Sequence, residues 1–146
     1  MTDKPILLVE DNPDDEILTI RAFRRSGIGN KIVVARDGVE ALDYLLGTGK
    51  RVGDGPLAPQ LVLLDLNLPL IDGLEVLRRF REDTAGKMLP VVLLTSSREQ
   101  RDLIAGYKLG CNSYVRKPIN FDAFVEAARR LGEYWLSLNE APDMTH

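Results

Sequence analysis

Five short runs of apolar residues alternate along the chain with longer stretches in which apolar residues recur at helical spacing. A short continuous apolar run is typical of a strand buried on both faces, as in a parallel sheet. The longer stretches have one apolar and one charged side, which is typical of helices that cover such a sheet. The predicted strands are residues 5–9, 31–35, 61–64, 90–94 and 112–116.

Glycine, proline and capping residues divide these strands from the helices between them. The predicted helices run from residue 14 to the glycines at 27 and 29, from 39 to 46, from 74 to about 81, from 98 to 109 and from about 120 to 138. The hydroxyls of residues 95–97 are expected to cap the fourth helix. Strict alternation of strand and helix predicts an α/β fold with a parallel sheet between two layers of helices.

The segment 47–59 (GTGKRVGDGPLAP) is longer than most connections between a helix and a strand. Its Gly49-Lys50 pair is reminiscent of a phosphate-binding loop, but Arg51 follows the lysine and the required glycine spacing is absent. We therefore predict a surface hairpin or a partner-contact loop here, and no nucleotide site.

Composition and charge narrow the classes of function. The chain has 146 residues, of which 45% are hydrophobic and 28% charged, and this suits one globular domain over residues 1–138 with a disordered tail at 139–146. A net charge of -3 leaves no basic footprint for nucleic acid. No apolar run approaches a membrane span and no signal-peptide pattern is present, so we expect a cytoplasmic protein without membrane contact.

Cysteine and histidine offer little chemistry. Cys111 is the only cysteine, which excludes an internal disulfide and suits a reducing compartment. The only histidine is the final residue, His146, so neither a Cys/His nucleophile pair nor a zinc site is expected.

Polar residues follow four of the predicted strands at their carboxyl ends, where open α/β sheets bind ligands. They are Glu10, Asp11, Asp65, Thr95 and Lys117. Each has an ordinary alternative as a turn residue, a helix cap or a solvated lysine. Their shared position on one rim favours a common site.

This set of residue types is suited to phosphoryl transfer. Crowded carboxylates repel one another unless a cation is present, and an oxygen-lined acidic pocket suits Mg²⁺. A lysine and a threonine can hold phosphoryl oxygens, and an aspartate can accept the phosphoryl group covalently.

Four motifs in this order resemble the receiver domain of bacterial two-component response regulators. They are VEDN (residues 9–12), LLDLNLPLIDG (63–73), VVLLTSS (91–97) and YVRKP (114–118). The resemblance covers residues 6 to about 138 and implies a flavodoxin-like fold with strand order 2-1-3-4-5.

The resemblance also implies roles for individual residues. Asp65 would be the phosphoryl acceptor, and Asp11 and Asp65 would bind Mg²⁺ directly. Glu10 would act on the metal through water and Asn67 through its backbone carbonyl. Thr95 and Lys117 would hold phosphoryl oxygens, with a cis bond between Lys117 and Pro118. A switch would pair Thr95 with Tyr114, whose ring can be buried or exposed.

A narrower resemblance, through the loop 47–59 and the Tyr134-Trp135-Leu136 ending, is to the single-domain regulators paired with bacterial phytochromes, the red-light-sensing histidine kinases. It suggests a homodimer through the last helix and strand, with Phe124, Tyr134 and Trp135 at the interface. The alternative is that Trp135 folds back onto its own domain. With no room for an output domain after residue 138, such a protein would act by docking.

Two rival functions stay open. A haloacid-dehalogenase-like phosphatase uses the same residue types but needs a second aspartate where this chain has Asn67, and an amide is no general acid. A flavodoxin-like ligand-binding module would need a phosphate loop where this chain has the acidic Glu10 and Asp11. We therefore predict a phosphoacceptor switch that receives its phosphoryl group from a histidine kinase and catalyses only its own phosphorylation and dephosphorylation.

Overall fold

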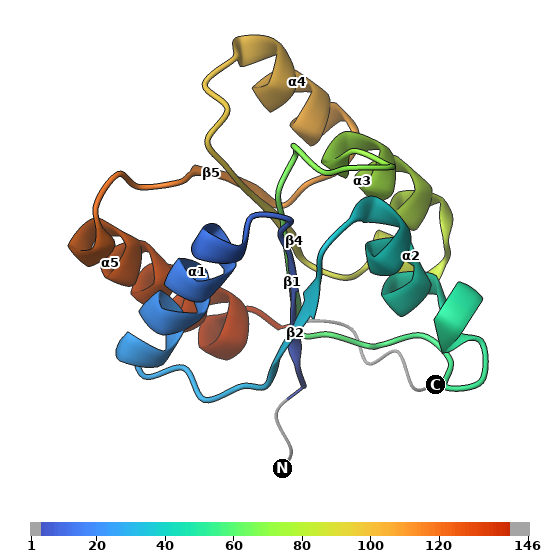
Figure 1. Cartoon of the computed structure of the whole chain (residues 1–146), viewed down its shortest axis with the longest axis horizontal. Helices are drawn as coiled ribbons and strands as arrows, with labels where there is room; N and C mark the ends of the chain where they lie inside the picture. The colour runs from blue at the N-terminus through green and yellow to red at the C-terminus, as the bar shows by residue number, and fades with distance from the viewer. Residues whose placement is uncertain (1–3, 141–146) are drawn as a thin grey trace.

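Residues 4–140 are described in the computed structural model of the chain, and they form a five-stranded parallel sheet with helices on both faces (Figure 1). The strands are β1 (Ile6–Val9), β2 (Ile32–Ala35), β3 (Leu61–Leu64), β4 (Val91–Thr95) and β5 (Ser113–Arg116). Their spatial order is β2-β1-β3-β4-β5. The predicted fold class and strand order are confirmed.

The helices divide between the two faces of the sheet. They are α1 (Pro13–Arg25), α2 (Gly38–Leu46), α3 (Gly73–Glu82), α4 (Gln100–Lys108) and α5 (Phe121–Leu131). Figure 1 shows α1 and α5 on one side of the sheet and α2 and α3 on the other. Three shorter helical segments, η1 (Gly49–Arg51), η2 (Ala85–Lys87) and η3 (Gly132–Leu138), complete the described elements.

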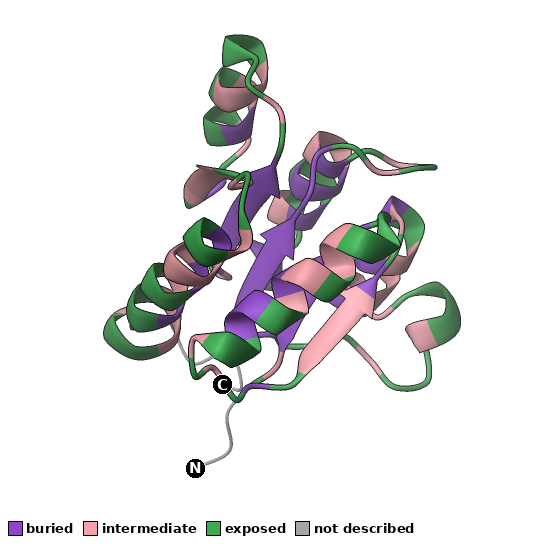
Figure 2. Cartoon of the chain, turned by 60° about the vertical axis from the view of Figure 1, so that its left-hand side comes forward, coloured by how far each residue is buried: buried purple, intermediate pink, exposed green. Residues whose placement is uncertain are grey.

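Each central strand supplies side chains to two separate cores. In β1, Ile6 and Leu8 pack with α1 and α5, while Leu7 and Val9 pack with α2 and α3. This alternation explains why the strands are continuous apolar runs, because successive side chains point to opposite faces. Figure 2 shows the central strands buried, whereas β2 at one edge is only partly so.

The register of the strands brings the predicted site residues to one rim. Val9 of β1 lies opposite Leu64 of β3, so the residues that follow them, Glu10 and Asp65, leave the sheet side by side. The Asp65 amide donates to the Val9 carbonyl at 3.1 Å. On the other side, the Lys117 amide after β5 donates to the carbonyl of Thr95 at 2.8 Å.

The last helix differs from the single helix predicted over 120–138. The α-helical part ends at Leu131, and η3 continues it with the wider turns of a π-helix. A side chain at Gly132 would lie 2.5 Å from the Ile28 side chain, so the helix approaches the turn after α1 closely here. Gln60 donates to the Leu136 carbonyl at 3.2 Å. These are tertiary contacts, so the spacing of apolar residues in the sequence could not indicate them.

The loop 47–59 does not form the hairpin that its length suggested. It contains the short turn η1 and folds against α2, where the Arg51 guanidinium lies 4.9 Å from the centre of the Tyr44 ring. The Leu57 amide donates to the Tyr44 carbonyl at 2.7 Å. The Leu57 side chain packs against the core, which holds the loop to its own domain.

Two local expectations are wrong. The bond between Lys117 and Pro118 is trans, not cis. The trans isomer is intrinsically favoured by about 0.5–1 kcal/mol before proline, and the Lys117 side chain reaches its partners without a cis bond. The hydroxyls of residues 95–97 do not cap α4, which begins after Glu99, and the Glu99 side chain makes no cap bond. The Ser97 hydroxyl instead donates to Asp102 and accepts from the Glu99 amide at 3.4 Å.

Within residues 4–140, no helix is long and apolar enough to cross a membrane. Asn139 and Glu140 follow η3 without regular structure, and the remainder of the predicted tail lies outside the described residues.

Candidate functional site

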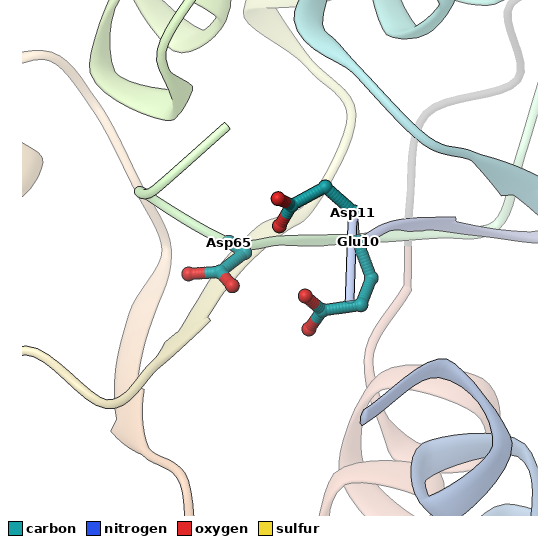
Figure 3. A group of neighbouring side chains, drawn as sticks. All are labelled: Glu10, Asp11 and Asp65. Carbon is teal, nitrogen blue, oxygen red and sulfur yellow. The ribbon is translucent and has the colours of Figure 1, made fainter. Parts of the chain in front are cut away.

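Three carboxylates meet where β1 and β3 end. Ligand oxygens of Glu10, Asp11 and Asp65 all lie within 4.8 Å of one another. Figure 3 shows the three side chains grouped around one space at the ends of these strands. Glu10 and Asp65 are buried, with 2% and 6% of their surface exposed, whereas Asp11 is exposed. The structure therefore brings together the three acidic residues that the sequence predicted.

Lys117 supplies the positive charge of this site. Its ammonium group donates to Glu10 Oε1 at 2.6 Å and to Asp65 Oδ2 at 3.0 Å. A third bond of 3.0 Å reaches Asp15 Oδ2. Because an ammonium group has three donors, all of its capacity is used by carboxylates.

Asp15 was missed by the sequence analysis. It lies in the first turn of α1, where acidic residues are common because they offset the helix dipole. The only signal in the sequence was its position three residues after the capping Asn12, and that position does not by itself indicate a contact with a distant lysine.

Backbone groups fix the directions of the two buried carboxylates. Asp65 Oδ1 accepts from the Asn67 amide at 3.3 Å, and Glu10 Oε2 accepts from the Asn12 amide at 3.2 Å. At the start of α3, a side chain on Gly73 would lie 2.1 Å from the Asp65 carbonyl oxygen. The close approach of α3 to Asp65 therefore requires glycine.

Burial sets the protonation of the site. Desolvation raises the pKa of Glu10 from 4.5 to about 7, because burial and the charge of Asp65 outweigh the bond to Lys117. Burial lowers the pKa of Lys117, but its carboxylate partners, Glu10 first, outweigh this and raise the pKa above its ordinary value. Lys117 is therefore charged at neutral pH, and Glu10 is partly protonated.

These residues fit a hard divalent cation. The grouped donor atoms are all carboxylate oxygens, which Mg²⁺ and similar ions prefer. One lysine balances only part of their charge, and the raised pKa of Glu10 marks a place where a cation could replace a proton.

Thr95 and Tyr114 both contact the segment that follows β4. Thr95 is fully buried, and its hydroxyl accepts from the Ser97 amide at 3.3 Å. The Tyr114 ring is half-buried against the core, and its hydroxyl donates to the Ser97 carbonyl at 3.4 Å. Ser97 therefore connects the two residues predicted to form the switch.

The predicted interface residues differ in exposure. Phe124 is 3% exposed and belongs to the core beside α1, so it offers no surface to a partner in this structure. Trp135 also packs against that core, whereas Tyr134 is 50% exposed. The rings of Tyr134 and Trp135 meet edge to face at 4.8 Å. Helical spacing placed Phe124 on the correct stripe but could not show that α1 covers it.

Comparison with known proteins matches residues 6–129 to the response regulator receiver domain. The chain belongs to this family. The acidic group, the lysine and the threonine described above thus lie within the region that the family shares.

Two relatives are similar in length to this chain. Rcp1 of Synechocystis sp. is 36% identical over 95% of this chain and 93% of its own. The probable methanogenesis regulatory protein FilR2 of Methanothrix harundinacea is 42% identical over 94% of this chain and 86% of its own. This receiver therefore spans most of the length of both proteins.

Solved structures support the same assignment. The phosphorylated cyanobacterial phytochrome response regulator RcpA superposes with a TM-score of 0.88 and 37% identity, over 97% of this chain and 100% of its own. The bacteriophytochrome response regulator AtBRR is 49% identical, with a TM-score of 0.76 over 96% of this chain and 100% of its own. The receiver is thus homologous to phytochrome response regulators.

Family membership establishes the general function. Receiver domains are switches that accept a phosphoryl group on an aspartate from a histidine kinase. They bind a divalent metal in the acidic pocket, and Rcp1 has been solved in a Mn²⁺-bound form.

The raised pKa of Glu10 predicts how the stability of the metal-free receiver depends on pH. The folded protein holds a proton on Glu10 up to about pH 7, which the unfolded chain releases near pH 4.5. The free energy of unfolding should therefore fall as pH rises from 5 to 8, by at most about 1.4 kcal/mol per pH unit from this group. Urea unfolding in EDTA measures this slope.

The variant Glu10→Gln is the control for this slope, because its amide does not titrate. The difference between wild type and variant should change between pH 5 and 8 and level off above. Parallel pH profiles for the two proteins would contradict the protonated Glu10.

Proposed function

We propose that this receiver acts as a stand-alone switch that takes a phosphoryl group from a histidine kinase onto Asp65. The observation that carries the proposal is the bond between Asp65 Oδ2 and the Lys117 ammonium beside two further carboxylates, Glu10 and Asp11. Asp65, like Glu10, is held by both Lys117 and a backbone amide, and it occupies the acceptor position of the receiver motif LLDLNLPLIDG. It is therefore oriented before any donor arrives, which favours nucleophilic attack.

The proposed reaction transfers a phosphoryl group from a phosphohistidine of the kinase to the unphosphorylated Asp65. One carboxylate oxygen of Asp65 attacks the phosphorus of the kinase phosphohistidine, a P–O bond forms, and the P–N bond breaks. The electron pair of the broken bond stays on the imidazole nitrogen. A separate hydrolysis step resets the switch: a water oxygen bonds to phosphorus, the bond to the Asp65 carboxylate breaks, inorganic phosphate leaves, and a water proton passes to solvent.

We propose Mg²⁺ as the ion of the acidic pocket. Asp11 and Asp65 would hold it directly, Glu10 through a water molecule, and Asn67 through its backbone carbonyl. When bound, the ion neutralises charge on the phosphoryl oxygens during transfer. Lys117 would hold another phosphoryl oxygen, since its ammonium already lies beside Asp65.

We propose that Thr95 and Tyr114 report the phosphorylation. If the Thr95 hydroxyl turned toward the phosphoryl group, it would lose the hydrogen bond that it accepts from the Ser97 amide. The Tyr114 hydroxyl donates to the carbonyl of Ser97, so a movement of Thr95 would be transmitted to the Tyr114 ring through Ser97 alone. The segment leads into α4, whose only buried residue is Gly106, so this helix is weakly anchored to the core.

We propose a phytochrome-type histidine kinase as the donor, on the basis of the likeness to RcpA and AtBRR. The protein would turn over no separate substrate, which distinguishes it from a phosphatase. A cytoplasmic location suits this role, because the ATP with which such a kinase phosphorylates its histidine is found there.

We also propose a homodimer through the last helix and strand. Tyr134 and Leu138 of η3 are 50% and 72% exposed, and large apolar side chains in such positions often mark interfaces. Phe124 would support this surface from inside the domain, since its side chain on α5 is buried in the core shared with α1.

The acceptor is tested by incubation with acetyl phosphate and Mg²⁺ followed by intact-mass measurement. Wild type should gain one phosphoryl group, and Asp65→Asn should gain none, because the amide is not a nucleophile of comparable strength. Asp54→Asn, in the surface loop, is the control and should be labelled like wild type. Adducts of equal yield on wild type and Asp65→Asn would exclude Asp65 as the acceptor.

The donor is tested by transfer from purified, autophosphorylated histidine kinases. A bacteriophytochrome kinase should phosphorylate the receiver at least about tenfold faster than a kinase with an unrelated sensor, a difference of about 1.4 kcal/mol in recognition. Equal initial rates would remove the argument for a phytochrome partner while leaving the role of Asp65 intact.

The dimer is tested by light scattering after size exclusion, with and without acetyl phosphate. Wild type should elute with the mass of two chains, and the double variant Tyr134→Ser, Leu138→Ser with the mass of one. Val52→Ser, which also removes an exposed apolar side chain, is the matched control. A wild-type monomer under both conditions would rule out this interface.

A further inference from the structure

The three carboxylate partners of Lys117 are not equivalent. Two of them, Glu10 and Asp65, also belong to the group that can hold a metal ion. The third, Asp15, bonds to Lys117 at 3.0 Å but is not a member of that group. Lys117 and a divalent ion thus compete for two carboxylates, while one carboxylate is left to the lysine alone.

We propose that Asp15 is a positioning residue that retains the Lys117 ammonium in the site when a metal ion engages Asp65 directly and Glu10 through water. The inference rests on the proposed metal-dependent phosphorylation of Asp65 and adds a residue to it. Without Asp15, the ammonium would have as partners only the two carboxylates that the ion also engages. With Asp15, it keeps one, and it stays within reach of the phosphoryl oxygens.

The local sequence explains why the Asp15 carboxylate is available. Asn12 caps α1, and its side chain accepts from the amides of Asp14 and Asp15 at 2.9 and 3.2 Å. An acidic residue at the third helical position often bonds back to the amide of the capping residue. Here that amide donates to Glu10 instead. The Asp15 side chain is therefore left for Lys117.

The exposure of the three partners also supports this division. The side chains of Glu10 and Asp65 are 2% and 8% exposed, whereas that of Asp15 is 38% exposed. A buried carboxylate that loses the lysine needs another cation, because an uncompensated buried charge is strongly unfavourable. A metal ion can replace the lysine at Glu10 and Asp65. Asp15 can remain with the lysine at the edge of the site, in contact with solvent.

The arrangement gives Asp15 two linked effects. It lowers the free energy that metal binding must supply to displace Lys117 from Glu10 and Asp65. It also limits the freedom of a long side chain that must hold a phosphoryl oxygen, and such positioning lowers the barrier to transfer. Asp14, its neighbour in α1, offers a comparison because it is exposed and makes no side-chain bond within the described residues.

The test is a double-mutant cycle read by calorimetric titration with Mg²⁺. Asp15→Asn should weaken Mg²⁺ binding about fivefold, which corresponds to about 1 kcal/mol. Asp14→Asn removes an equal charge from the same helical turn and should change the affinity by less than about twofold. In a Lys117→Met background, Asp15→Asn should have no larger effect than Asp14→Asn, because there is no ammonium to retain.

A second measurement separates positioning from general electrostatics. With saturating Mg²⁺, Asp15→Asn should slow labelling by acetyl phosphate, while Asp15→Glu should recover much of the rate because it restores a carboxylate. Urea unfolding of each variant establishes that the fold is retained. If Asp15→Asn binds Mg²⁺ like Asp14→Asn, or if its effect persists unchanged in Lys117→Met, the inference is wrong.

A failure of the inference about Asp15 can be distinguished from a failure of the proposed function. If wild type takes no phosphoryl group, the proposed acceptor fails, whatever the Mg²⁺ titrations show. If wild type is labelled on Asp65 and the cycle shows no coupling between Asp15 and Lys117, only the inference about Asp15 fails.

Discussion

The crowding of carboxylates around Lys117 is the interaction on which the site depends. Glu10 and Asp65 are buried side by side because β1 and β3 are paired in register and both end at the same rim. A single ammonium group balances only part of this charge, and burial, together with the charge of Asp65, raises the pKa of Glu10. The site is therefore built to receive a further cation, and its charge balance changes whenever a metal ion or a phosphoryl group enters.

The two sides of the site differ in rigidity. On one side, α1 and α5 pack against a continuous core, and Asn12 anchors the start of α1 beside the acidic residues. On the other side, Ser97 holds the segment after β4: its amide donates to Thr95, its carbonyl accepts from Tyr114, and its hydroxyl donates to Asp102. The helix α4 that follows buries little. A change of charge at the site would thus displace the segment after β4 more readily than the start of α1.

The far end of the domain is organised separately from the site. The π-helical segment η3 continues α5, and Gly132 lets it approach the turn after α1. Trp135 is packed there on the core, while its edge-to-face neighbour Tyr134 remains exposed. The aromatic pair thus connects the hydrophobic core to the surface that we propose for dimerisation.

The sequence alone determined the fold class and the residues at the strand ends. Apolar runs between amphipathic stretches specify a parallel sheet with two helical layers, because each strand must bury both of its faces. Carboxylates, a threonine and a lysine at the carboxyl ends of those strands then share one rim by topology. The order of the four motifs was enough to indicate the receiver family.

Other features depended on contacts between residues far apart in the chain. The bond between Asp15 and Lys117 spans 102 positions, and no local pattern distinguishes this aspartate from an ordinary acidic residue in a first helical turn. The burial of Phe124 depends on α1, and the π-helical turns after Leu131 accompany a close approach to Ile28. Spacing along the chain shows which face a side chain occupies, but only the tertiary structure decides what covers that face and which charge lies opposite.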